Sequence, residues 1–448
     1  MNRLNEMRQV IPQGDIILEN WRKEVGAINT AMNGGLDYNK QILTAVMLEN
    51  ASRHINRINT LNEATQSADV SYFKKYAINL LSAAVPNLIA TDIVSVQPLG
   101  ARVGEVRHLN ISYGSNKGRI KRGDHMFGVF EGGNGNTDYS SDRIEGELFE
   151  AATDAVTLSW GPVVPGTVTV RCNGQTGTDA KGDGNITGTF TGTIDYATGR
   201  ISATFGSHDV EVDYEYDNMN APVQAPEVNL SIKSIPMIAK SRKLKALYSL
   251  DSAFDLQTEY GMQMNNELVA YTASEIKHEI DGEIMNDLLR IAGAKATTFN
   301  ATPGEGISLR DHNEGFYNTI VEGGNNIFQA TKLANASFII AGIDACNIIE
   351  SLPRFKPSGI INPVGPHLAG WIGDKAVYKN PYYPAGSYVL GYKGQGLFDA
   401  GYIYAPYMPI MSTQLIMDAD FQGSKGFATS YAKKAVNANM YSKGTITR

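Results

Sequence analysis

The residues best suited to chemistry in this sequence are its seven histidines and two cysteines, and their spacing matches no known site. No HExxH pair occurs and no cysteine lies close to a histidine, so a zinc site is not predicted. Phosphate-binding GxxxxGK[ST] and nucleophile GxSxG motifs are absent as well. Cys346 falls early in a predicted helix, where a thiolate would be stabilised, but it has no identifiable base partner and a buried core cysteine is favoured. We therefore predict no catalytic residue, no metal and no cofactor.

One cluster of cations could bind a partner. Four basic residues occur within six positions: Lys117, Arg119, Lys121 and Arg122. Gly118 and Gly123 make this tract a poor helix, so a hairpin or an extended loop is predicted. The cations could meet phosphate or an acidic protein surface. Because the whole chain carries a net charge of −7, a protein partner is favoured over nucleic acid.

Length and composition set the frame for these residues. The 448 residues suggest about three domains, and 42% hydrophobic with 19% charged residues excludes a wholly disordered chain. With only two cysteines, Cys172 and Cys346, the chain cannot form a disulfide framework or a tetrathiolate zinc site, which favours a reducing compartment. The first twenty residues lack the apolar core of a signal peptide, and no run approaches 18 apolar residues. The composition is typical of a soluble, mildly acidic, intracellular protein.

Residues 1–63 are predicted to be helical and solvated, because their seven basic and seven acidic side chains balance. One narrow apolar stripe recurs at helical spacing and consists of Ile42, Leu43, Val46, Met47, Ala51 and Ile55. A helix with such a stripe needs a partner surface. Docking on the chain's own domain therefore stays open as an alternative to a solvated segment.

A separate small all-β module is predicted at 151–220, after strand-like runs at 88–96 and 106–113. Short β-prone runs alternate there with glycine turns, and nine acidic against three basic side chains give a net charge of −6. The stretch from Asp179 to Asn185 has some features of a calcium loop, but its spacing departs from the pattern and the closing Glu is missing, so calcium is not favoured. Aromatic residues of the module could serve a carbohydrate platform, although their alternating positions favour a core.

The most helical segment spans residues 252–292, with Ser252 as the expected cap. Forty residues at 1.5 Å each would reach roughly 60 Å, although Gly261 and Gly282 permit bends. The charged positions on its polar face are predicted to be solvated or to face a neighbour: Glu267, Glu275, Lys277, Glu279, Glu283 and Asp287. A helix at 312–334, a buried strand at 338–342 and a helix at 343–352 follow. Together with the strands of the last hundred residues, they predict an α+β chain rather than regular βαβ units.

Three segments together resemble the major capsid proteins of tailed bacteriophages, in particular those of T-even-type myophages. The first runs from Val85 to Gly100 and on through Ile111–Gly114. The second runs from Ala239 to Ser249, followed by Leu256–Gly261, Glu267-Leu268 and Glu279-Ile280. The third comprises Ala405-Pro-Tyr407, Phe421-Gln422, Gly426-Phe427 and Tyr431. Order and spacing agree over roughly residues 60–130 and 225–448.

The resemblance implies the Hong Kong 97 capsid fold. Its parts would be an N-terminal arm at 64–100 and an extended loop at 101–235, with the all-β module inserted at 151–220. A peripheral domain at 236–335 would contain the spine helix at 252–292. An axial domain at 336–430 and a C-terminal segment at 431–448, returning to the peripheral domain, would complete the fold.

The resemblance also implies maturation and partners. Relatives lose an N-terminal segment to a prohead protease that cuts after [LI]-x-E, and Leu61-Asn62-Glu63 followed by Ala64 fits, so removal of 1–63 is predicted. The expected partners are further copies of the chain in hexamers and pentamers, a scaffold, the protease, a portal, decoration proteins, and packaged double-stranded DNA without sequence-specific contact. No membrane is involved, and the expected location is the virion after assembly in the host cytoplasm. Lys117, Arg119, Lys121 and Arg122 are expected to contact an adjacent subunit.

Two other interpretations remain at this point. An encapsulin-like compartment would share the implied fold but enclose cargo enzymes, and the acidic module and the arm cleavage point away from it. A surface adhesin or carbohydrate-binding protein would use the β module as its binding part. An enzyme is the weakest option, because no convergent acid, base or metal set is present in the sequence.

Overall fold

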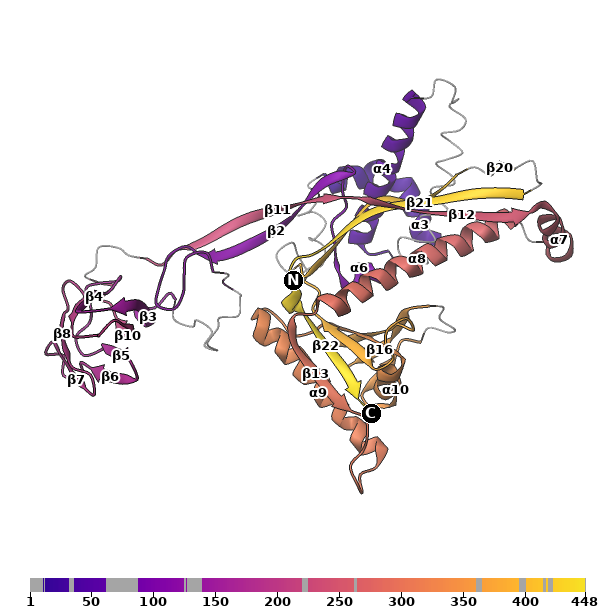
Figure 1. Ribbon diagram of the computed structural model, residues 1–448. Helices are drawn as coiled ribbons and strands as arrows, with labels where there is room; N and C mark the ends of the chain where they lie inside the picture. The colour runs from indigo at the N-terminus through magenta and orange to yellow at the C-terminus, as the bar shows by residue number, and fades with distance from the viewer. Residues whose placement is uncertain are drawn as a thin grey trace. The chain divides into compact units, whose positions relative to one another are not determined.

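The computed structural model describes residues 11, 13–31, 36–61, 88–124, 126, 139–219, 225–261, 264–359, 365–394, 400–413, 416–417 and 422–447. The chain divides into two compact units (Figure 1). Unit 1 comprises residues 1–108 and 233–448, and unit 2 comprises residues 109–232. Helices and strands are both present in unit 1, whereas the elements of unit 2 are strands throughout its described part. The chain is therefore a mixed α and β protein, as predicted.

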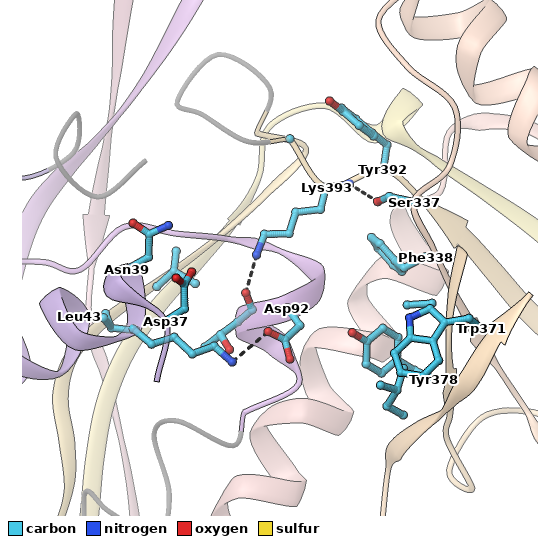
Figure 2. A pocket seen from close by; sticks show the side chains of 16 residues that line it. Asp37, Asn39, Leu43, Asp92, Ser337, Phe338, Trp371, Tyr378, Tyr392 and Lys393 are labelled. Atoms are coloured by element: carbon cyan, nitrogen blue, oxygen red, sulfur yellow. Dashed lines mark hydrogen bonds and ion pairs between the residues drawn. The ribbon is translucent and has the colours of Figure 1, made fainter. Parts of the chain in front are cut away.

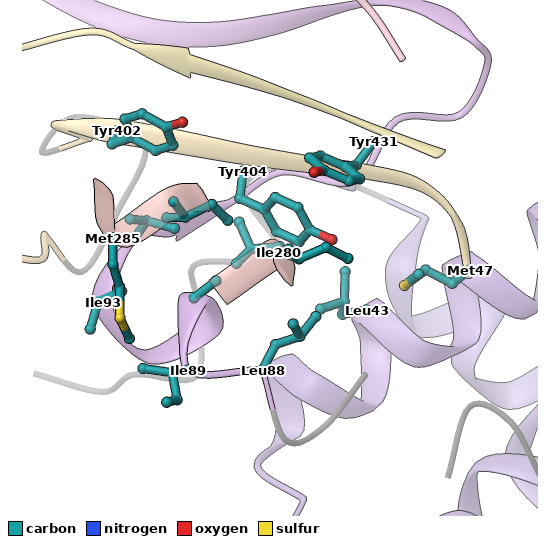
Figure 3. Packing of buried hydrophobic residues seen from close by; sticks show 14 of the residues in the cluster. Leu43, Met47, Leu88, Ile89, Ile93, Ile280, Met285, Tyr402, Tyr404 and Tyr431 are labelled. Atoms are coloured by element: carbon teal, nitrogen blue, oxygen red, sulfur yellow. The ribbon is translucent and has the colours of Figure 1, made fainter. Parts of the chain in front are cut away.

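The N-terminal helices of unit 1 are docked and not solvated. They are α2 (Gly14–Asn20), α3 (Arg22–Ala31) and α4 (Tyr38–Leu61). The middle of α4 is enclosed almost all round, so that Ile42, Leu43 and Met47 share one core with Leu88 and Ile280 from distant parts of the chain (Figure 3). The solvated interpretation is wrong for α4, and the alternative of docking on its own domain is confirmed. The apolar stripe was the signal for this packing.

A short helix and the longest described helix of the chain's middle part pack against that core. Residues 88–96, predicted as a strand, instead form α6 (Ala90–Ile93) and only two strand residues in β1 (Ser95–Val96). The predicted 252–292 helix is two helices, α7 (Leu250–Tyr260) and α8 (Met264–Ile291). Gly261 ends α7 with φ of 66° and donates its N–H to Gln257 O, a left-handed stop that glycine makes at little cost. The cap of α7 is Ser249, whose hydroxyl accepts the N–H of Ser252, and not Ser252 itself.

Two sheets complete unit 1 in its described residues. The first has the order β1, β19 (Tyr402–Ser412), β21 (Gln422–Ala435) and β12 (Lys240–Ser249), and β20 (Ile416–Met417) also pairs with β21. The second has the order β13, β22, β18, β14, β17, β16, β15. Its strands are β13 (Ala294–Asn300), β14 (Phe338–Ala341), β15 (Phe355–Pro357), β16 (His367–Ile372), β17 (Lys375–Lys379), β18 (Ser387–Gly391) and β22 (Tyr441–Thr447), with a 3₁₀ turn at Ala438–Met440.

Two helices cover the second sheet with apolar side chains. They are α9 (Leu309–Thr331) and α10 (Ile343–Ser351), close to the bounds predicted for both. The hydroxyl of Ser308 caps α9 by accepting the N–H of Asp311. Phe316 and Ile320 of α9 and Cys346 of α10 lie in one core with Ile339 and Leu390 of the sheet. The four residues of β14 are fully buried, which explains why this strand reads as a continuous apolar run.

Unit 2 is built on strands with the order β3, β10, β5, β6, β7, β8, β9, β4. Their bounds are β3 (Arg143–Ala152), β4 (Ala155–Thr157), β5 (Thr169–Cys172), β6 (Gln175–Thr178), β7 (Asn185–Gly188), β8 (Gly192–Asp195), β9 (Arg200–Ser202) and β10 (His208–Glu215). In β10, Val210, Val212 and Tyr214 are buried while the residues between them are not, which is the alternation of a strand with one core face. A two-stranded ribbon of β2 (Val103–Tyr113) and β11 (Val228–Ile238) begins in one unit and ends in the other.

Candidate functional site

The basic tract of unit 2 forms a tight turn. Lys117 and Ile120 form an antiparallel bridge, and Gly118 has φ of 57°. A Cβ at Gly118 would lie 2.2 Å from Glu145 O, so both the left-handed backbone and the close approach require glycine here. The predicted hairpin or loop is therefore confirmed in its local form.

The structure divides the four cations into two that bond within unit 2 and two whose side chains are exposed. Lys117 is only 4% exposed, and its Nζ donates to the carbonyl oxygens of Tyr139, at 2.9 Å, and Ser141. Arg119 lies at the surface, and its Nη2 donates to Glu211 Oε1 at 2.5 Å. That bond, followed by the charge of Glu211, raises the pKa of Arg119. Within one chain these two cations hold unit 2 together, whereas the side chains of Lys121 and Arg122 are exposed.

The polar face of α8 forms a charged seam that joins α8 to the first sheet of unit 1. We define this seam by its three acids on α8, spaced four residues apart, and its two cations on the strands: Glu279, Glu283, Asp287, Arg242 and Lys433. Arg242 of β12 bonds Glu279 at 2.7 Å and also Glu283, and Lys433 of β21 bonds Glu283 at 2.6 Å and also Asp287. The prediction that these acids are solvated or face a neighbour is therefore wrong for Glu283 and Asp287.

Two tyrosines complete the seam from the sheet side. Tyr402 donates its hydroxyl to Asp287 at 2.7 Å, and Tyr431 donates to Glu283 at 2.5 Å. Burial alone would raise the pKa of Glu283, but the hydrogen bonds from Lys433 and Tyr431 and the charges of Lys433 and Arg242 outweigh it and lower this pKa to about 2. The seam therefore keeps Glu283 ionised and fixes α8 to the sheet. The i, i+4 spacing of the acids was visible in the sequence, but their partners lie far away along the chain.

A fourth carboxylate of α8, Asp281, faces the opposite way, toward α6. Asp281 is fully buried and accepts the backbone N–H groups of Ala90, at 3.0 Å, and Ile89, at 3.3 Å. Burial raises the pKa of Asp281 to about 6, against the lowering effect of these two bonds and of Lys277. This contact fastens the residues before β1 to α8, and no sequence signal pointed to it.

A cavity of about 550 Å³ lies between the N-terminal helices and the second sheet of unit 1 (Figure 2). Two acids and two lysines line it together with Trp371 and other aromatic side chains, and Lys40 bonds Asp92 at 3.0 Å. Lys393 crosses the cavity and donates its Nζ to Thr91 O at 2.6 Å. These charges balance and in part satisfy one another, so the lining does not indicate one class of ligand.

The candidates for chemistry occupy structural positions. Cys346 is completely buried, and burial raises the pKa of its thiol to about 12, so the predicted core cysteine is confirmed. Among the described residues, no group of three or more His, Cys, Asp or Glu side chains is placed to hold a metal. Asp179 of the calcium-like stretch is buried and accepts the hydroxyl of Tyr196 and the N–H of Gly166. No helix in the described part of the chain is long and apolar enough to cross a membrane.

The aromatic side chains of the predicted module 151–220 belong to its core. Trp160, Phe190, Phe205, Tyr214 and Tyr216 are buried, and Tyr196 is partly buried against them. They leave no exposed stacking platform in the described residues of the module, in agreement with the core interpretation. Of the predicted cleavage residues, Leu61 ends α4, and Glu63 and Ala64 lie outside the described residues.

Comparison with known proteins decides the family. The sequence profile described as "Major capsid protein Gp23" matches residues 70–448. The chain belongs to this family of major capsid proteins, and it is a capsid shell protein. The major capsid protein of Enterobacteria phage T4 is 26% identical over 411 residues, covering 82% of this chain and 75% of that protein. The corresponding protein of Enterobacteria phage T6 is 25% identical over 405 residues, covering 82% and 78%.

Solved structures give a weaker likeness. The capsid of Myoviridae phage XM1 aligns with a TM-score of 0.35 and 7% identity, covering 51% of this chain and 81% of that one. A chain of Mycobacterium phage Bobi aligns with a TM-score of 0.34 and 8% identity, covering 67% and 88%. Both TM-scores are low, and membership of the family follows from the sequence match alone.

Proposed function

We propose that this chain assembles into the hexamers and pentamers of an icosahedral phage head that encloses double-stranded DNA. The observation that carries this function is the match of residues 70–448 to the major capsid protein family. The chain's role in it is structural and non-enzymatic, as its membership of a capsid protein family suggests. The location is the virion, after assembly in the host cytoplasm.

The ribbon of β2 and β11 supports assembly with further copies. A two-stranded ribbon is marginal by itself in water. Leu230 and Ile232 of β11 are 67% and 68% exposed, and Val228 on the same face is also exposed. Apolar side chains repeated at every second position of a strand indicate a face that another protein covers. In a shell, each subunit supplies several neighbours for such a face.

We assign the parts of a Hong Kong 97-like fold to this chain as follows. An N-terminal arm spans 64–100, an extended loop spans 101–235 with the module 151–220 inserted in it, and a peripheral domain spans 236–335. An axial domain spans 336–430, and residues 431–448 return to the peripheral domain. The length of α8 and the separate unit of 109–232 support this division.

Maturation and partners belong to the same proposal. Cleavage after Glu63 removes residues 1–63, and a scaffold, a protease, a portal and decoration proteins act with the shell. Lys121 and Arg122 are the cations of the basic tract best exposed for contact with an adjacent subunit, whereas Lys117 and Arg119 bond within unit 2. A double charge reversal of Lys121 and Arg122 should impair assembly at low salt, and normal assembly of that variant would remove them from the interface.

Negative-stain microscopy of the purified chain tests the function directly. Closed particles or sheets of capsomers are expected, either alone or after addition of a scaffold. Particles that protect double-stranded DNA separate a phage head from an encapsulin-like compartment, which would enclose protein cargo. A chain that stays monomeric in every condition, with or without scaffold, would contradict the proposal.

A further inference from the structure

Helix α7 and strand β12 are consecutive in the chain and carry opposite charges. Residues 250–261 contain three acids, Asp251, Asp255 and Glu259, and no lysine or arginine. β12 contains Lys240, Arg242, Lys243 and Lys245 and no acid. Arg242 is used in the charged seam. In the described part of the chain, no ion pair includes any of the three acids or of the three lysines.

The acids of α7 lie on its outward face beside an exposed aromatic ring. Residues four apart lie on the same side of a helix, so Asp251, Asp255 and Glu259 form one stripe. Phe254 borders this stripe beside Asp251 and is 59% exposed, whereas Leu256 at the other border and Ala253 on the far side are only partly exposed. A helix of eleven residues with so little buried surface is marginal without a partner. The outward face of α7 therefore has the character of an uncovered contact surface.

One face of β12 offers the complementary surface. Side chains alternate along a strand, so Lys243, Lys245 and Leu247 share the face opposite to that of Arg242, which points to α8. Both lysines are exposed, and Leu247 is 55% exposed. β12 is also the last strand of its sheet in the described residues, so its free edge lies beside these side chains.

The spacing of the two charge patterns matches. Lys243 and Lys245 are two residues apart on a strand, about 6.7 Å. Asp255 and Glu259 are four residues apart on a helix, about 6 Å. Two ion pairs can therefore form side by side while Phe254 covers Leu247. We propose that the outward face of α7 in one copy docks on this face of β12 in a second copy, with Asp255 and Glu259 meeting Lys245 and Lys243.

The docking is directional, because the two surfaces differ. Such a heterologous contact closes into a ring when the rotation between copies permits it. It rests on the proposed assembly function and deepens it by naming one contact between copies. Exposed charge pairs mainly set the specificity and the salt dependence of a contact, so the effect of these residues should be largest at low ionic strength.

A charge-swap experiment in the full-length chain tests the docking. One variant carries Asp255→Lys and Glu259→Lys, a second carries Lys243→Glu and Lys245→Glu, and a third carries all four changes. Each double variant should lower the yield of particles about tenfold at low salt, and the fourfold variant should recover most of it. A matched control, Glu314→Lys with Glu322→Lys, makes the same charge change at exposed positions of α9 and should assemble normally.

A crosslink gives a second readout that does not depend on yield. A chain with Asp255→Cys and Lys245→Cys should form a disulfide between copies when particles are oxidised, and the two native cysteines are buried and should not contribute. Normal assembly of both double variants, or failure of the fourfold variant to recover while circular dichroism shows it folded, would overturn the docking. The docking would also be overturned if the Lys243→Glu and Lys245→Glu variant lost DNA binding and the fourfold variant did not regain it. DNA, and not a second copy, would then be the partner of β12. If particles form and their yield does not change in the charge-swap variants, the docking is wrong and the proposed function stands. If the unchanged chain forms no particles, the proposed function and the docking are both contradicted.

Discussion

Replacing Asp281 by Asn should stabilise the chain at neutral pH relative to acidic pH, although it removes a buried hydrogen-bonding carboxylate. The pKa of Asp281 rises on folding from 3.8 to about 6, chiefly because the side chain is buried. An acid whose pKa is raised stabilises the fold below its unfolded pKa and loses that contribution as the pH rises through the folded value. The contribution of Asp281 is therefore complete below about pH 4 and lost above about pH 6.

The size of the effect follows from the same shift. About two pKa units at 1.4 kcal/mol each give about 3 kcal/mol in full, of which about 2 kcal/mol falls between pH 4.5 and 8. An Asn at 281 can still accept the N–H of Ala90 but carries no charge to bury. The difference in free energy of unfolding between Asp281→Asn and the unchanged chain should therefore move by about 2 kcal/mol in favour of the variant over this range.

Urea unfolding followed by far-UV circular dichroism measures this difference, because the helices described in the structure all lie in unit 1. Glu283→Gln is the matched control on the same helix. The pKa of Glu283 is lowered to about 2 by its cationic and tyrosine partners, so its contribution is present above about pH 4.5 and is lost only as the pH falls toward 2. About a third of the Glu283 side chain is exposed, so Glu283→Gln should lower the free energy of unfolding by about 1–2 kcal/mol. This difference should be nearly constant from pH 5 to 8. A pH-independent difference for Asp281→Asn would refute the reasoning.

Three further substitutions probe single contacts, each read as a change in the free energy of unfolding. Leu43→Ala leaves a cavity at a buried position of α4 and should cost about 3 kcal/mol. The control Ile16→Ala, at an exposed position of α2, should cost less than about 0.5 kcal/mol. Equal losses would contradict the docking of α4. Lys117→Met removes the donor of the hydrogen bonds to the carbonyls of Tyr139 and Ser141 and should destabilise unit 2 by about 2 kcal/mol, while Arg122→Ala should be neutral. Gly118→Ala combines a left-handed backbone with a 2.2 Å approach to Glu145 O, so it should cost at least about 2 kcal/mol, and a wild-type melting temperature would exclude the tight turn.

Elements whose cause is local were predictable from the sequence. α9 has its cap, its apolar stripe and its end within one stretch of chain, and the predicted 312–334 differs from Leu309–Thr331 by three residues at each end. β14 was likewise predictable from its short apolar run, and α10 from the helical pattern that follows it. Within unit 2, the alternation of β10, continued one residue past its end, places Tyr214 and Tyr216 in the core without knowledge of any other strand.

Elements whose cause is distant were missed. Residues 88–96 are β-prone, but Asp281, about 190 positions away, accepts the N–H groups of Ile89 and Ala90 and so satisfies the start of a helix there. The sequence predicts that the acids of α8 are solvated or face a neighbour, because their partners, Arg242 and Lys433, come from strands outside the helix. An apolar stripe or a row of acids on a helix indicates that other side chains pack against it, but the sequence does not show which part of the chain supplies them.

The packing of α4 bears on the proposed cleavage after Glu63. Ile42, Leu43, Val46, Met47 and Leu48 are buried, and at about 1.5–3 kcal/mol each their burial amounts to about 7–15 kcal/mol, as large as the stability of a typical domain. Asn50 adds two hydrogen bonds, to Leu99 O at 2.7 Å and Tyr407 O at 3.1 Å. Cutting one peptide bond removes none of these contacts. We therefore expect the 1–63 fragment to stay bound to residues 64–448 of an isolated cleaved chain.

Size-exclusion chromatography with mass analysis of the peak checks this expectation. Both fragments should elute together from the cleaved chain, and Asn50→Ala should speed the exchange of the fragment with a labelled copy. Complete separation of the two fragments under native conditions would mean that the docked α4 contributes little. Because loss of the fragment uncovers Leu88, Ile280 and Tyr404, its departure from a shell must be coupled to new contacts that bury the same side chains. Those contacts can come only from a rearranged subunit or from its neighbours, so removal of the segment and a change in subunit packing should occur as one step.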